Sequence, residues 1–214
     1  MTVREALAHV KHVQVGPGSP PAVITAARWL AERTGAAFAE VPALAPSPAA
    51  GVFQVKASGT DSAAPGTAPV LLLRRDGSGS LSSAVGRPLF AAAAYLVDVL
   101  AADEVDRLEN GLGLSPTFGW NRSCYDLFLT QEGRIQRGLN PETYVRQLAT
   151  WGFTHAEVNA LAYPMSLETG PKGEIYPMFY TYCPAMDQFV NSSLNRGLYP
   201  AYYLSANLAI LKRN

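Results

Sequence analysis

Strand-like and helix-like segments alternate over the first half of the chain, and this alternation limits the fold more than any other feature. Strand-like segments carry apolar residues at alternate positions, whereas helix-like segments repeat them every three to four positions. The segments, in the order strand, helix, strand, strand, hairpin and helix, are residues 9–16, 22–35, 36–41, 51–57, 68–87 and 87–102. This order favours a small α/β or α+β sandwich, in which two helices pack on a sheet. We expect an α/β fold and a small α/β domain at residues 1–117.

Local signals support several of these segments. In the first helix, Gly35 is a natural C-terminal cap, and helical spacing places four apolar residues on one face: Val23, Ala27, Leu30 and Ala31. The letters DGSGS at residues 76–80 predict the turn of a hairpin. The Ala-rich stretch that follows predicts one long helix, with Pro88 in its first turn.

The pattern changes after a polar connector, and a second section begins at residue 118. Asn140 and Pro141 are typical of a helix start, and Gly152 follows the expected helix end. Residues 153–161, with the sequence FTHAEVNAL, predict a strand.

Two further helices are expected at residues 184–197 and 199–214. In the second of these, Leu204, Leu208 and Leu211 follow helical spacing, although its tyrosines would also suit a strand. An amphipathic helix at this position would find few partners within its own section. We therefore expect the chain to be the N-terminal part of a longer protein; the alternative is a C-terminal helix docked on the first domain.

Composition narrows the classes of function. The 17 Lys and Arg residues balance the 17 Asp and Glu residues, so neither a nucleic acid nor an anionic membrane is an expected partner. No apolar stretch is long enough to span a bilayer, and the N-terminus lacks the apolar core of a secretory signal, which favours a cytoplasmic protein. Cys124, Cys183 and the three histidines are scattered along the chain, so no metal site and no cofactor are expected.

The second section carries a resemblance to a known group of enzymes. The stretch FGWNRSCYDLF and the later GLNPETYVRQLATWGFTHAEVNALAYP resemble the start of the catalytic barrel in glycoside hydrolases related to α-glucuronidases and β-N-acetylhexosaminidases. In those enzymes a small α/β domain precedes a (β/α)8 barrel, and an Arg followed by an Asp marks the first barrel strand. Arg122, Asp126, the helix 141–151 and the strand 153–161 occur here in that order. The hexosaminidase branch has RG where this chain has RS, so the exact family stays open.

The resemblance implies that residues 118–214 are the start of a TIM-barrel-like catalytic domain, an incomplete (β/α)8 barrel. It also implies that Arg122 binds sugar, since the guanidinium fork suits hydroxyl and carboxylate groups. Asp126, Glu157 and Asn159 fall near the same predicted rim. Arg122 could equally pair with Asp126 or stack on Trp120, and Asn159 could be a buried amide that bonds the backbone.

We expect the full-length protein to be a glycoside hydrolase that acts on uronic-acid or N-acetylhexosamine sugars. The catalytic residues are unknown, because the family's catalytic Glu lies late in the barrel and has no counterpart here. The expected partners are a carbohydrate substrate and either the remainder of the barrel or further copies of the chain. The alternative is a non-catalytic α/β domain that binds carbohydrate or protein.

Overall fold

The structure is a computed structural model that describes residues 1–59, 68–115, 141–153, 155–158 and 191–202. The chain forms two compact units. The first comprises Met1–Gly119, Ala149–Gly152 and Asn195–Gly197, and the second comprises Trp120–Leu148, Phe153–Leu194 and Leu198–Asn214.

A six-stranded sheet with the strand order β2-β1-β3-β5-β4-β6 organises the first unit. The strands β2, β1, β3 and β5 are parallel, whereas β4 runs antiparallel to β5 and β6. Their bounds are His12–Val15 (β1), Ala37–Glu40 (β2), Val52–Ala57 (β3), Val70–Leu73 (β4), Gly79–Ser83 (β5) and Leu112–Gly113 (β6). This mostly parallel sheet, together with its helices, confirms the α/β class.

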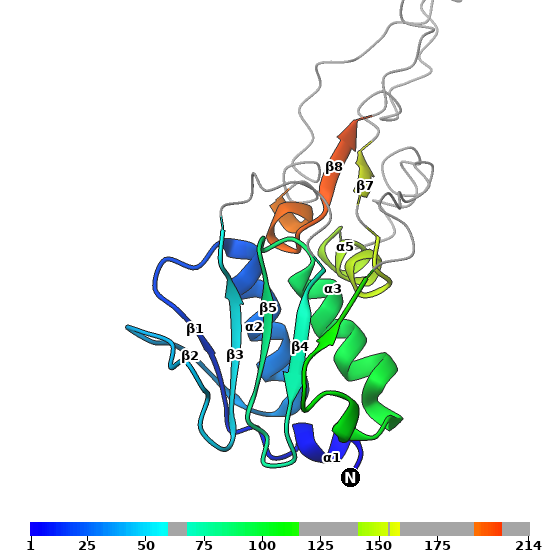
Figure 1. Ribbon diagram of the computed structural model, residues 1–214. Helices are drawn as coiled ribbons and strands as arrows, with labels where there is room; N and C mark the ends of the chain where they lie inside the picture. Colours follow the sequence, from blue (N-terminus) through cyan, green and yellow to red (C-terminus); the bar gives the residue numbers. More distant parts are fainter. Residues whose placement is uncertain (60–67, 116–140, 154, 159–190, 203–214) are drawn as a thin grey trace, which may run out of the picture. The chain divides into compact units, whose positions relative to one another are not determined.

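The helices α2 (Pro21–Thr34) and α3 (Leu89–Ala94) pack against one face of the sheet and against each other (Figure 1). The core lies between these layers and is apolar; its buried residues include Val13, Val15, Phe53, Val55, Leu71, Leu73 and Leu81 from the sheet and Val23, Leu30, Leu89 and Phe90 from the helices. Burial of a side chain of this size stabilises a fold by about 1.5–3 kcal/mol. We call the face of the sheet that meets these helices its inner face.

The helix α2 confirms its sequence signals. The four apolar residues expected on one helix face are all buried. Gly35 ends the helix in the left-handed conformation, with φ of 72°, and its N–H donates to the carbonyl oxygen of Ala31. Glycine adopts this conformation without a steric penalty, which explains why the helix ends there.

The predicted hairpin is also confirmed. Strands β4 and β5 pair antiparallel, with Leu73 opposite Gly79. In the turn between them, the Asp76 carboxylate accepts a hydrogen bond of 2.9 Å from the backbone N–H of Ser78.

The long helix predicted at residues 87–102 is confirmed as a helical segment from Leu89 to Ala102, but it is not one α-helix. The α-helix α3 gives way to a π-helical turn, η1 (Tyr95–Val99), and then to a 3₁₀ turn, η2 (Leu100–Ala102). Neither Gly nor Pro occurs in these two turns, so the sequence has no local signal for the change of helix type.

A short N-terminal helix, α1 (Val3–Leu7), was not expected. Thr2 and Glu5 form a capping box at its start, in which each side chain bonds the other residue's backbone N–H. The N–H of Val3 donates to the carbonyl oxygen of Asp103 at 2.9 Å, just before the 3₁₀ turn η3 (Val105–Arg107). The N-terminal residues are therefore tied to the segment that follows η2.

Beyond residue 140, the structure describes the helix α5 (Pro141–Thr150), two strands and the helical residues 191–195, which confirm the described part of the helix expected at residues 184–197. The helix α5 and strand β7 (His155–Val158) confirm the elements expected there, and Gly152 follows α5 with φ of 77°. Strand β8 (Tyr199–Tyr202) corrects the helix expected from residue 199, because its backbone pairs with β7 in parallel. The leucines that suggested a helix lie outside the described residues. Among the helices that the structure describes, none has the length and apolar character needed to cross a membrane.

Candidate functional site

Most residues of the predicted sugar site fall outside the part of the chain that the structure describes. These are Arg122, Asp126 and Asn159. Glu157 is within strand β7, where its backbone lies opposite Ala201 of β8. Whether these four residues come together therefore stays a prediction.

Strands β7 and β8 run in the same direction, which is the arrangement expected at the rim of the predicted barrel. Its four register pairs run from His155 opposite Tyr199 to Val158 opposite Tyr202. Because the strands are parallel, both carboxyl ends lie at the same edge, and Glu157 is one residue from that edge. In β/α barrels, functional side chains follow the carboxyl ends of the strands.

The carboxyl edge of the six-stranded sheet is a second place where a ligand would be expected. In open α/β sheets, ligands bind where the strand order reverses, which here lies between β1 and β3. The loop that follows β1 has the sequence GPGSP and leads into α2. Helix N-termini bind phosphate through free backbone N–H groups, but Pro20 and Pro21 have none. The N–H of Val23 already donates to the carbonyl oxygen of Pro20 at 2.9 Å. Two of the N–H groups that a helix start would otherwise offer to a phosphate are therefore missing.

The face of the sheet opposite the helices, its outer face, carries a polar row. Gln14, Gln54 and Ser80 lie side by side in register across β1, β3 and β5. Gln54 is fully buried, and neither its Nε2 nor its Oε1 atom has a hydrogen-bond partner. An unsatisfied buried polar group costs about 1–3 kcal/mol. Sequence reasoning missed Gln54, because a single polar residue within an apolar strand normally indicates a solvated face.

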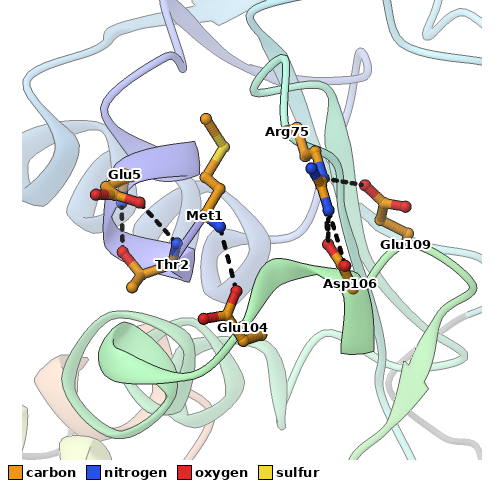
Figure 2. A network of polar contacts seen from close by, with 7 residues as sticks. All are labelled: Met1, Thr2, Glu5, Arg75, Glu104, Asp106 and Glu109. Carbon is orange, nitrogen blue, oxygen red and sulfur yellow. Dashed lines mark hydrogen bonds and ion pairs between the residues drawn. The ribbon is translucent and has the colours of Figure 1, made fainter.

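A polar network joins the turn between β4 and β5 to the segment around η3 (Figure 2). The Nη2 atom of Arg75 donates to both carboxylate oxygens of Asp106, at 2.7 and 2.8 Å. Its Nε atom lies 3.6 Å from Oε1 of Glu109. The hydrogen bond and the charge of Asp106 raise the pKa of Arg75 above its usual value. Because the side chains of Arg75 and Asp106 are each 57% exposed, we interpret this pair as a surface contact of the fold.

The N-terminal residues form separate polar contacts (Figure 2). The Met1 ammonium group lies 3.2 Å from Oε2 of Glu104. Glu5 accepts a hydrogen bond from the backbone N–H of Thr2, and this bond is the main reason why its pKa is lowered. The pKa of Asp76 is also lowered, first by the Ser78 hydroxyl and then by the Ser78 N–H. A general acid in a glycosidase needs a raised pKa, so Glu5 and Asp76 are unsuited to that role.

Among the described residues, no group of three or more His, Cys, Asp or Glu side chains could hold a metal ion. No protein-family model matches this chain, and no curated protein matches it.

Proposed function

We propose that this chain is the N-terminal part of a carbohydrate-active glycoside hydrolase that acts on uronic-acid or N-acetylhexosamine sugars. In this proposal, the first unit is an accessory α/β domain. The second unit contains the first βα units of an incomplete (β/α)8 barrel, which a longer protein would complete.

The parallel pairing of β7 with β8 is the observation that carries the proposal. Parallel neighbours cannot be joined by a tight turn and need a crossover of a dozen or more residues. The connection here runs from residue 159 to residue 198, and residues 191–195 within it are helical. A strand, a connection that contains helix and a parallel neighbouring strand are the repeating unit of a β/α barrel.

The α/β class of the first unit also supports the proposal. The resemblance implies a small domain with helices on a sheet before the barrel. The mostly parallel sheet with α2 and α3 on its inner face has this composition.

In the proposed site, Arg122 binds the substrate through its guanidinium fork. The two parallel hydrogen bonds of such a fork match the carboxylate of a uronic acid or two neighbouring hydroxyls. The carboxylates of Asp126 and Glu157 would accept hydrogen bonds from the remaining hydroxyls, and the Asn159 amide would accept or donate one. The catalytic carboxyl pair is left unassigned, because in the related enzymes the catalytic Glu comes from later in the barrel.

The test is hydrolysis by the full-length protein that contains this chain. We expect it to release the aglycone from an aryl α-glucuronide or from an aryl N-acetyl-β-glucosaminide. Arg122→Ala should lower kcat/KM at least about tenfold on the accepted substrate, because a hydrogen bond to a charged group contributes about 1.5–3 kcal/mol. The melting temperature should change little.

Arg107→Ala provides the matched control. Arg107 is an exposed arginine that pairs with Asp103 on the surface of the first unit, so its loss should leave hydrolysis unchanged. The proposal fails if neither substrate is hydrolysed. The role given to Arg122 fails if Arg122→Ala lowers the melting temperature while kcat/KM stays at the wild-type value.

A non-catalytic α/β carbohydrate- or protein-binding domain is the second candidate. It is favoured by the extensive core of the first unit. The described residues of that unit themselves form this core. Calorimetric titration of residues 1–117 with glucuronic acid and N-acetylglucosamine separates the candidates. Saturable binding to this segment, without hydrolysis by the full-length protein, would favour the binding domain.

A further inference from the structure

We draw no further inference here: the strongest candidate, the polar row of Gln14, Gln54 and Ser80 on the outer face of the six-stranded sheet, contains a buried amide without a hydrogen-bond partner, but nothing in the structure shows what covers it.

Discussion

Phe53 and Gln54 are neighbours in β3, and both are fully buried, yet they lie on opposite faces of the sheet. Phe53 is on the inner face, where the helices and the sheet supply an apolar core. Gln54 is on the outer face, where its amide is removed from water without a hydrogen bond in return. Equal burial therefore does not mean equal stabilisation. Truncation of an inner-face side chain should lower the free energy of unfolding. Replacement of Gln54 on the outer face by an apolar side chain should raise it.

Phe53→Ala should have the largest effect. Truncation of a buried phenylalanine removes its apolar contacts and leaves a cavity, which typically costs about 3–5 kcal/mol. The free energy of unfolding, measured by urea titration with circular dichroism, should fall by that amount. Val70→Ala is the control, because Val70 in β4 is 44% exposed and its truncation should cost much less. Equal losses in the two variants would contradict the assignment of the core to the inner face.

Gly79→Ala tests how tightly the inner face is packed around Phe53. Gly79 lies opposite Phe53 in register, and a Cβ atom at this position would lie 2.8 Å from the phenylalanine ring and would also contact the Leu72 carbonyl oxygen. Overpacking of this kind costs about 1–3 kcal/mol.

Gly113→Ala is the matched control for Gly79→Ala. Gly113 lies in β6 of the same sheet, and a Cβ atom there would meet nothing within 4 Å. Its substitution should be close to neutral in the same urea titration. If both alanine variants unfold at the wild-type urea concentration, the close approach of Gly79 to Phe53 is wrong.

The first unit shows how far the sequence predicts this fold. The spacing of apolar residues in α2, its final Gly35 and the DGSGS turn gave correct elements because these signals are local. The start of α1 also had a local signal, since Thr2 and Glu5 fit the capping-box pattern. The π-helical turn had none. A local sequence pattern therefore could not reveal this change of helix type.

Prediction from the sequence was weaker in the later part of the chain. The leucines at 204, 208 and 211 suggested that the helix began at Tyr199, yet Tyr199–Tyr202 pairs with β7. Such pairing depends on a partner about 40 residues away, which helical spacing cannot detect. Of the four predicted site residues, the structure describes the backbone of Glu157, so the sugar site remains a prediction from the resemblance.

Gln54→Leu should reverse the sign of the effect seen at Phe53. Replacement of a buried, unpaired amide by an apolar side chain of similar size removes a penalty of about 1–3 kcal/mol. We expect the free energy of unfolding to rise by about 1 kcal/mol or more. Gln14→Leu is the matched control, because Gln14 is the half-buried neighbour in the same row and should gain less. A loss of stability in Gln54→Leu would show that the amide has a partner in solution.

The smallest effect is expected from Asp76, in the turn that joins β4 and β5. Its contribution to the free energy of unfolding should depend on pH. In the folded protein the hydroxyl and the N–H of Ser78 lower the pKa of Asp76 below its ordinary value of 3.8. The unfolded chain therefore binds a proton at higher pH than the folded chain does. The stabilising contribution is present above pH 3.8 and is lost as the pH falls through the folded-state pKa.

Titration of the Asp76 carboxyl carbon by NMR measures this shift directly. We expect a pKa below 3.8 in the wild-type protein and a value closer to 3.8 in Ser78→Ala, which lacks the hydroxyl that contributes most. Asp76→Asn keeps a side-chain oxygen acceptor but cannot titrate, so the free energy of unfolding should depend less on pH in this acid range. A wild-type Asp76 pKa at or above 3.8 would mean that the Ser78 contacts do not hold the turn in solution.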